Sequence, residues 1–281
     1  MASSSNQLPG LKIMSQEAWA QMQIDLRNGL TRIPVLPLGH DAAYVWIPKN
    51  GCTTLKQAWL SSQGYASDDI HRNALAYTHW MNPDEFRAVM QIRAAVAIWR
   101  DPIDRFVSAC RSHLRVLTTG AIRTKLQDAT AGHPKFLEEA LESHDRLFKR
   151  HRLCSFDDAL DPRIVMNQVA LKLSDWISCH LDWSHHTIPQ VSYLGGDPSC
   201  YSTILGMEQI QDLVQHWRSA SGRDLDLSPQ HVSAERAVVD RWRRLKREDL
   251  AMESLKALKD FYSVDYAFLD LAKSVLPPLS L

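Results

Sequence analysis

The sequence predicts an α/β fold in which helices cover both faces of a mainly parallel central sheet. Two short apolar runs, residues 44–47 and 94–99, carry this prediction, because each leads through a tight turn into a segment with helical spacing. A continuous apolar run of this length is typical of a strand that is buried on both faces. Two strand-turn-helix units of this kind predict neighbouring parallel strands.

The first half of the chain follows this pattern in order. We expect a helix over residues 15–30, a first strand within 35–47, a helix to about residue 63, and a loop over 64–82. Asn82 then begins a helix, because a capping Asn is followed by a Pro at the first helical position and by acidic residues in the first turn.

The second apolar run, residues 94–99, is followed by Asp101 and Pro102, which cap and begin another helix. Its apolar residues recur at i, i+3, i+4 and i+7, so one face is expected to pack on the sheet. These residues are Ile103, Phe106, Val107 and Cys110.

In the second half, residues 118–152 are polar and rich in His, Lys, Arg and Glu. We expect them to form a helical insertion or lid within a single domain that spans residues 1–281. The elements expected after this insertion are a helical region over 155–176, a strand over 201–205, a helix over 208–220, a long helix over 233–261 and a terminal tail.

Composition restricts the class of protein. The 281 residues carry 32 basic and 32 acidic side chains, so the formal net charge is zero, which argues against bulk nucleic acid or an anionic membrane as the main partner. Five cysteines, an odd number with scattered spacing, give no disulfide framework. Neither a membrane-length apolar run nor a signal peptide is visible, so we expect a cytoplasmic protein. This leaves open an anchor outside the sequence given.

The turn after residues 44–47 favours an anion. A strand-turn-helix junction directs free backbone N–H groups and the positive end of the helix dipole into one concavity. Lys49 adds a positive charge, Gly51 lets the backbone approach a ligand, and Thr53 and Thr54 can donate to phosphate oxygens. The turn is not a Walker A loop, because the lysine precedes the only glycine.

A second group of candidate ligands follows residues 94–99. Arg100 leaves the end of a predicted strand, where open α/β sheets bind ligands, and its guanidinium can hold a phosphate by two hydrogen bonds. Ser108 lies about two helical turns further on. A helix start with surface arginines is the alternative interpretation of this segment.

Together the two motifs resemble those of sulfotransferases, especially the Golgi-type carbohydrate and heparan 2-O-sulfotransferase branch. Residues 48–56, PKNGCTTLK, resemble the family's 5′-phosphosulfate loop, and residues 100–111, RDPIDRFVSACR, resemble its 3′-phosphate motif. Weaker likenesses lie at 155–160, 186–190, 231–233, where the family's Asn is missing, and 260–266. The resemblance covers roughly residues 41–268.

The resemblance implies a P-loop-like three-layer α/β/α fold and a sulfuryl donor, 3′-phosphoadenosine 5′-phosphosulfate (PAPS), used without a metal. Lys49 would meet the charge that develops on the leaving phosphate, while Arg100 and Ser108 would hold the 3′-phosphate. The donor-binding residues that it implies are Lys49, Asn50, Gly51, Cys52, Thr53, Thr54, Arg100, Ser108 and Ser233. The acceptor would be a hydroxyl compound, such as a glycan.

Sulfuryl transfer needs a base for the acceptor hydroxyl, and His79 is the first choice. It lies between the two motifs, and the heparan 2-O-sulfotransferase branch places its catalytic histidine similarly. His71 and His113 are reserves, and Glu85 is a distant candidate because some relatives use a glutamate. A loop histidine bonded to backbone is the alternative for His79.

Four other interpretations concern a metal site, a nucleic-acid site, a kinase and a non-catalytic protein. The segment that contains Cys179, His180, Asp182, His185 and His186 has metal-ligating side chains, but their spacing fits no standard zinc pattern. The basic run at 241–247 is more typical of a solvated face than of a nucleic-acid site. A P-loop-type kinase and a non-catalytic nucleotide-binding protein on the same fold remain alternatives, and the sequence does not define the oligomeric state.

Overall fold

The computed structural model describes most of the chain between residues 21 and 276. The segments outside this description are 1–20, 22–23, 27, 39–41, 65–69, 71–73, 75–76, 92–93, 115–137, 139–141, 143–160, 180, 222–240 and 277–281. The insertion or lid expected at 118–152 therefore lies outside the described residues, apart from Glu138 and Glu142, which are helical.

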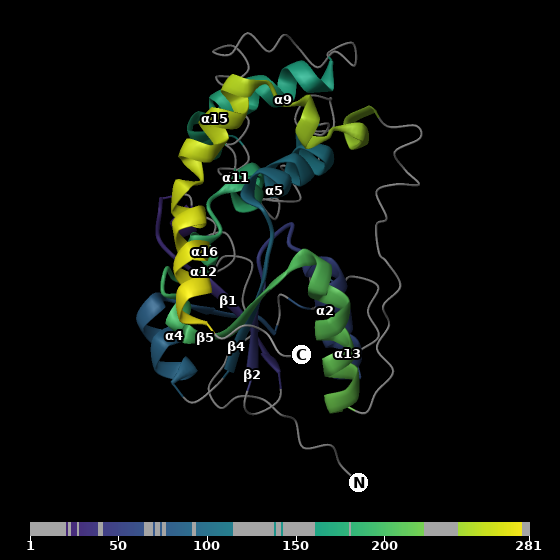
Figure 1. The fold of residues 1–281 in the computed structure, drawn as a ribbon, viewed down its shortest axis with the longest axis vertical. Coiled ribbons are helices and arrows are strands. Elements are labelled where there is room, and N and C mark those ends of the chain that lie inside the picture. The colour runs from purple at the N-terminus through teal and green to yellow at the C-terminus, as the bar shows by residue number, and fades with distance from the viewer. Residues whose placement is uncertain are drawn as a thin grey trace.

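A five-stranded sheet forms the centre of the molecule (Figure 1), with strand order β3-β1-β2-β4-β5. The strands are β1 (Ile33–Leu38), β2 (Ala42–Val45), β3 (His79–Met81), β4 (Ala94–Trp99) and β5 (Tyr201–Gly206). β1 is antiparallel to β2 and β3, whereas β2, β4 and β5 pair in parallel, so β3, β2, β4 and β5 all run in one direction. The α/β fold with a mainly parallel sheet is thus confirmed.

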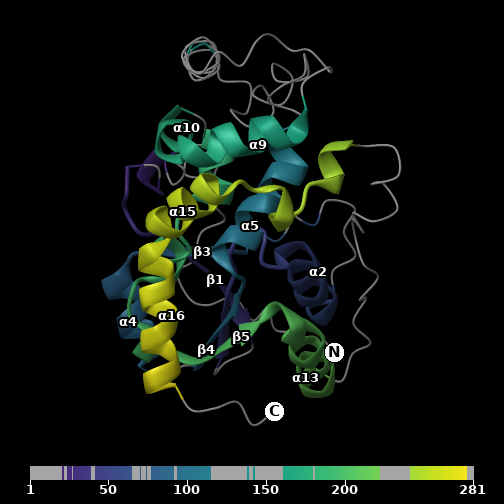
Figure 2. The ribbon, with the colours of Figure 1, turned by 45° about the horizontal axis from the view of Figure 1, so that its top comes forward.

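The sheet separates two apolar layers, as alternating side chains on each strand require. On one face α2 (Cys52–Ser62) and α13 (Ile210–Ser221) pack against β2 and β4. The other face carries the larger cluster, to which α5 (Pro102–Ala109) and the C-terminal helix α16 (Ser263–Val275) contribute. Figures 1 and 2 show α2 and α13 on one side of the sheet and α16 on the other.

The remaining helices complete the larger layer and the end of the molecule beyond α5. They are α4 (Pro83–Met90), α9 (Pro162–Leu171), α10 (Leu173–Cys179), α11 (Leu181–Thr187), α12 (Val191–Leu194) and α15 (Met252–Phe261). Short 3₁₀ turns lie at η2 (Pro198–Cys200), η3 (Met207–Gln209), η4 (Arg241–Arg244) and η5 (Arg247–Asp249), and a π-helical turn, η1 (Cys110–Leu114), extends α5.

The strand expected within residues 35–47 is two strands, and one more strand lies in the expected loop. Leu36 pairs with Tyr44, so β1 and β2 form an antiparallel pair, and β3 adds to the other edge of β1. Pro34 and Pro37 within β1 conceal it in the sequence, because proline lacks the N–H that a strand uses. His79 therefore lies in a strand rather than in a loop.

The long helix expected over 233–261 is also wrong within the described residues. Its basic centre forms the turns η4 and η5, and a regular helix begins only at Met252. The helix α16 that follows, Ser263–Val275, was not expected at all. In contrast, β4, α4 and α5 lie where the sequence predicts them. No helix among the described residues is long and apolar enough to cross a membrane.

Candidate active site

The N-terminus of α2 lacks the side-chain cap that α4, α5 and α9 have. Side-chain oxygens of Asn82, Asp101 and Asp161 accept hydrogen bonds from the first turns of α4, α5 and α9. In α2 the capping position is Gly51, no side chain caps the helix, and no acidic residue lies in the first turn. Backbone N–H groups without a cap, together with the helix dipole, make this terminus suitable for an anion.

The turn before α2 has an unusual backbone. Lys49 has φ 70° and Gly51 has φ 68°, both left-handed, and Lys49 is the only non-glycine residue with positive φ within the described residues. Such a conformation costs an L-residue about 1–2 kcal/mol. At Gly51 a Cβ atom would also overlap the Cδ1 atom of Ile210, so the end of this side chain in α13 would have to move.

The two predicted phosphate motifs are in contact. Arg100, directly after β4, donates from Nη1 to the carbonyl oxygen of Lys49 at 2.9 Å. Burial lowers the pKa of the Arg100 guanidinium from its ordinary value, while the nearby carboxylate of Asp104 acts in the opposite direction. The guanidinium has five N–H donors, so this bond leaves others for a phosphate.

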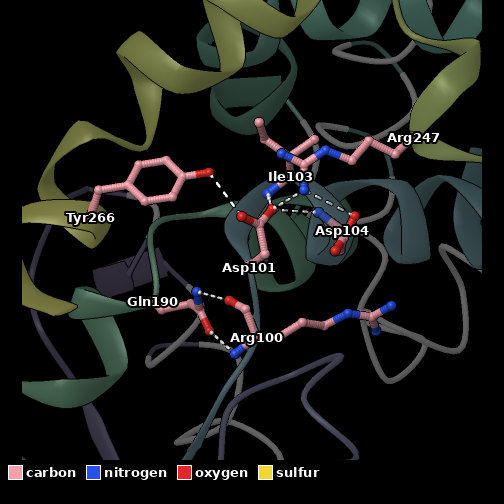
Figure 3. Close-up of polar contacts among 7 residues, drawn as sticks. All are labelled: Arg100, Asp101, Ile103, Asp104, Gln190, Arg247 and Tyr266. Atoms are coloured by element: carbon pink, nitrogen blue, oxygen red, sulfur yellow. Dashed lines mark hydrogen bonds and ion pairs between the residues drawn. The ribbon is translucent and has the colours of Figure 1, made fainter. Parts of the chain in front are cut away.

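Asn50 and Gln190 join the same two segments below the surface. Asn50 donates from Nδ2 to the carbonyl oxygen of Ile98 at 2.8 Å and to Oε1 of Gln190 at 2.6 Å. Gln190 in turn donates from Nε2 to the carbonyl oxygen of Arg100 at 2.8 Å. Figure 3 shows the Gln190 amide facing the Arg100 backbone, while the Arg100 side chain extends away from it. Both Asn50 and Gln190 are fully buried.

A buried carboxylate holds Gln190 from the opposite side. Asp265 of α16 accepts hydrogen bonds from the backbone N–H groups of Gln190 and Val191 at 2.9 and 3.0 Å. Burial raises the pKa of Asp265 to about 6, and the two hydrogen bonds act against that rise. The C-terminal helix thus supports the segment that positions Asn50 and Arg100.

Asp101 has a structural role next to Arg100. It caps α5 by accepting from the N–H groups of Ile103 and Asp104. The same carboxylate pairs with Arg247 of η5 at 3.0 Å and accepts from the hydroxyl of Tyr266 at 3.3 Å (Figure 3). The basic segment η4–η5 is thereby fixed beside the start of α5.

Arg105 is a buried support for the turn before α2. Its side chain is fully buried and donates from Nε to the carbonyl oxygen of Pro48 at 2.9 Å and from Nη1 to that of Ile188 at 2.6 Å. The carbonyl oxygens of Pro48 and Lys49 thus both accept hydrogen bonds from arginines of the second motif, Pro48 from Arg105 and Lys49 from Arg100. Sequence reasoning did not assign this role to Arg105.

The other predicted residues are distributed around this centre. Thr53 and Thr54 are half-buried in the first turn of α2, and Ser108 is half-buried on α5, where its carbonyl oxygen accepts from the hydroxyl of Ser112. Ser233 and the reserve base His71 lie outside the described residues.

His79 is half-buried at the start of β3, and its ladder partner Val35 also pairs with Val45, the last residue of β2. The register thus places His79 level with the carboxyl end of β2, on the far side of β1. Glu85 is exposed, and its carboxylate accepts from the N–H of Asn82 at 2.8 Å as part of a capping box. Glu85 therefore has a structural role that accounts for its position.

Three histidines gather near the end of α5. The rings of His113 and His186 stack with centroids 4.0 Å apart, and the ring of His185 lies 5.1 Å from that of His186. The Tyr193 hydroxyl donates to the carbonyl oxygen of His185 at 2.7 Å, so the 3.0 Å contact between that hydroxyl and Nδ1 of His185 is donated by the imidazole. Among the described residues, no group of three or more His, Cys, Asp or Glu side chains could hold a metal ion.

The sequence did not single out Gln190, Asp265 or a buried lysine, Lys56, as parts of the site. Gln190 was noted only within the segment 186–190, and its contact with Asn50 spans 140 positions of the chain. Lys56 was noted only as the last residue of the segment 48–56. Local patterns reveal neither long-range contacts nor the burial of a charged residue.

An uncapped helix N-terminus after a parallel strand, with a lysine and an arginine joined beside it, is an arrangement suited to a phosphate-like anion at the carboxyl end of the sheet. The family model described as "Sulfotransferase family" matches residues 39–272, and the chain belongs to this family. No curated protein and no solved structure matches the chain. The family supports sulfuryl transfer in general.

Proposed function

We propose that this protein transfers a sulfuryl group from PAPS to an acceptor hydroxyl by in-line displacement. The observation that carries the proposal is the hydrogen bond from Arg100 to the Lys49 carbonyl beside the uncapped N-terminus of α2. It joins the site proposed for the 3′-phosphate to the site proposed for the 5′-phosphosulfate. One nucleotide with phosphates at both positions would bridge them.

In this proposal the donor is held by backbone and side chains together. The N–H groups of the first turn of α2, with the hydroxyls of Thr53 and Thr54, bind the 5′-phosphosulfate. The turn residues Asn50, Gly51 and Cys52 shape this cradle, and the buried Asn50 fixes it to β4. Arg100, Ser108 and Ser233 bind the 3′-phosphate and the nucleotide.

The chemistry requires one proton acceptor and one group that stabilises the leaving phosphate. The acceptor oxygen attacks sulfur, the bond between sulfur and the bridging phosphate oxygen breaks, and 3′-phosphoadenosine 5′-phosphate (PAP) leaves. Lys49 meets the negative charge that grows on the bridging oxygen. His79 takes the proton of the acceptor hydroxyl, supported by its half-buried position at the carboxyl end of the sheet, with His71 and His113 as reserves.

The proposal also covers the acceptor and the domain organisation. A carbohydrate hydroxyl is the acceptor that we propose, from the resemblance of the motifs to the carbohydrate branch. Residues 1–281 would form a single sulfotransferase domain, a proposal supported by the family match over most of the chain, with 118–152 as a lid or insertion that meets the acceptor.

Calorimetric titration with PAP in the absence of magnesium tests this function. We expect metal-independent binding by the wild type that weakens at least about tenfold, or 1.4 kcal/mol, in Arg100→Ala. Arg87→Ala, which removes an exposed arginine of α4, serves as the control and should bind as the wild type does. Absence of PAP binding, with ATP·Mg²⁺ bound instead, would overturn the proposal in favour of a kinase. Tight PAP binding without any transfer to glycan acceptors would favour a nucleotide-binding protein.

A further inference from the structure

Lys56 is a buried cation one turn inside the helix that begins at the candidate donor site. Its side chain is 2% exposed, whereas lysine is among the residues least often buried. The ammonium Nζ lies 3.2 Å from the centre of the Trp46 ring. This contact with an aromatic face retains a positive charge in an apolar environment.

The fold gives this charge little other compensation. Burial lowers the pKa of Lys56 to about 8, and Cys52 is the ionisable group whose charge acts against that decrease. No carboxylate among the described residues contributes to stabilising the ammonium. The positive end of the helix dipole also disfavours a cation in the first half of α2. A residue that the fold places so unfavourably is a candidate for function.

The position of Lys56 brings its charge to the level of the anion-binding turn. Lys56 is the fifth residue of α2, so its Cα lies about 6 Å along the axis from that of Cys52. Long side chains on a helix point back toward its N-terminus. The contact with Trp46 agrees with this direction, because Trp46 directly follows β2 and precedes Lys49 by three positions.

The ring of Trp46 is itself fixed on its other edges. Its indole N–H donates to the hydroxyl of Thr78 at 3.1 Å, and the rings of Trp80 and His185 lie 5.4 and 6.1 Å away, centre to centre. These contacts fix the orientation of the ring against which the Lys56 ammonium lies.

We propose that Lys56 supplies a second positive charge to the donor site and that its ammonium pairs with the 5′-phosphosulfate group of the bound donor. This inference rests on the proposed function and extends it, because the proposed function assigns a role to Lys49 and none to Lys56. The donor phosphosulfate provides the anionic partner of Lys56 in the complex.

The proposal predicts a specific pH dependence of donor binding. Pairing with an anion raises the pKa of a lysine, so the complex keeps a proton that the free protein loses above about pH 8. Affinity for PAP should therefore fall as the pH rises above 8. Lys56→Arg should abolish this decrease, because a guanidinium stays charged throughout the range.

Other titratable groups near Lys56 could produce a similar decrease, and the arginine variant separates them. They are Cys52 on the same helix, Lys49 in the turn, His79 of β3 and His185 of α11. Tyr44 of β2 also faces α2, but burial raises its pKa well above the ordinary value, so it keeps its proton over this range. α13 presents apolar residues to α2. All of these groups remain in Lys56→Arg, so a decrease that persists in this variant belongs to one of them.

The experiment is calorimetric titration with PAP from pH 7 to 9.5, together with thermal unfolding, on the wild type, Lys56→Arg, Lys56→Met and the control Lys172→Met. Lys172 is an exposed lysine at the end of α9. We expect the wild type to lose at least about tenfold in affinity over this range, Lys56→Arg to lose less than about threefold, and Lys172→Met to behave as the wild type. Lys56→Met should bind about tenfold more weakly at pH 7, with no further pH dependence, and should unfold at an equal or higher temperature.

Each other result has a defined meaning. PAP binding by Lys56→Met that equals that of the wild type, or the same alkaline loss in Lys56→Arg, would overturn the role of Lys56 and leave the proposed function intact. If Lys56→Arg does not fold, the comparison of Lys56→Met with the wild type tests the role of Lys56. A Kd for PAP that depends on pH in the wild type but not in Lys56→Met would support that role. A wild type that binds no PAP at any pH would instead overturn the proposed function and this inference together.

Discussion

Arg100 donates a hydrogen bond to the carbonyl oxygen of Lys49 at 2.9 Å, and this bond connects the ends of two neighbouring parallel strands. The carbonyl belongs to a residue with left-handed backbone, φ 70°. Arg100 therefore stabilises a strained turn in addition to the phosphate contact that we propose for it. The two functions require the same guanidinium, because one N–H faces the carbonyl and the others can reach a ligand.

Replacing Arg100 by lysine separates charge from geometry. Lysine keeps the positive charge but loses the planar arrangement of donors that reaches both the carbonyl and a phosphate. We expect Arg100→Lys to weaken PAP binding by at least about tenfold, or 1.4 kcal/mol, measured by calorimetry. Arg87→Lys on the exposed face of α4 is the matched control. Unchanged affinity in Arg100→Lys would show that charge alone matters at this position.

The hydrogen bond between Asn50 and Gln190 should couple the two residues energetically. Removing either side chain leaves buried polar groups of the other without a partner, which costs about 1–3 kcal/mol. We expect Asn50→Ala and Gln190→Ala each to lower the free energy of unfolding by that amount. The double variant should lose less than the sum, by about 1 kcal/mol or more. Urea unfolding of the four proteins measures this coupling, and losses that add within about 0.5 kcal/mol would contradict it.

Local sequence patterns predicted the elements that local chemistry determines. β4 begins and ends at Ala94 and Trp99 as the apolar run indicates, because a strand buried on both faces needs apolar residues throughout. Asn82 and Asp101 cap α4 and α5 as expected, since these signals act over three or four residues. The two motifs of the candidate site were recognisable for the same reason.

Long-range pairing was not predictable in this way. β1 contains two prolines, and β3 is only three residues long, so neither has a strand pattern of its own. Both depend on partners in the sheet. The burial of Lys56 and Asp265 is also invisible locally, because each is charged and is buried by elements that lie far away in sequence. Lys56 lies in the helix that follows the candidate donor turn, and Asp265 lies against the Gln190 segment. At both positions a role in the site can offset the free-energy cost of burying a charged group.

Gly51 has a left-handed backbone and lies against the side chain of Ile210 in α13. Alanine at φ 68° is strained, and its Cβ would overlap Ile210. We expect Gly51→Ala to lower the free energy of unfolding by about 1–3 kcal/mol and to weaken PAP binding. Adding Ile210→Ala should relieve the overlap but not the backbone strain. In urea unfolding the double variant should therefore be less destabilised than the sum of the single ones. Strict additivity would show that the overlap has no energetic weight.

Asp265 should make the protein less stable as the pH rises from about 4 to 6. Burial raises its pKa in the folded state from 3.8 to about 6, so over this range the folded state holds a proton that the unfolded state has lost. The stability that protonated Asp265 provides is present below about pH 4 and is lost progressively as the pH passes through 6. A difference of about two pKa units corresponds to about 3 kcal/mol.

Asp265→Asn should remove this dependence, because asparagine does not titrate. We expect the free energy of unfolding of the variant, relative to the wild type, to increase by about 3 kcal/mol between pH 4 and 7. At pH 4 the free energy of unfolding of Asp265→Asn should be lower than that of the wild type. Asparagine has a single side-chain oxygen and accepts only one of the two bonds from Gln190 and Val191. Asp270→Asn, at an exposed position of α16, is the control and should show no such change. If the free energy of unfolding of Asp265→Asn instead decreases relative to the wild type as the pH rises, the two N–H groups outweigh burial. The pKa of Asp265 in the folded protein would then lie below its ordinary value.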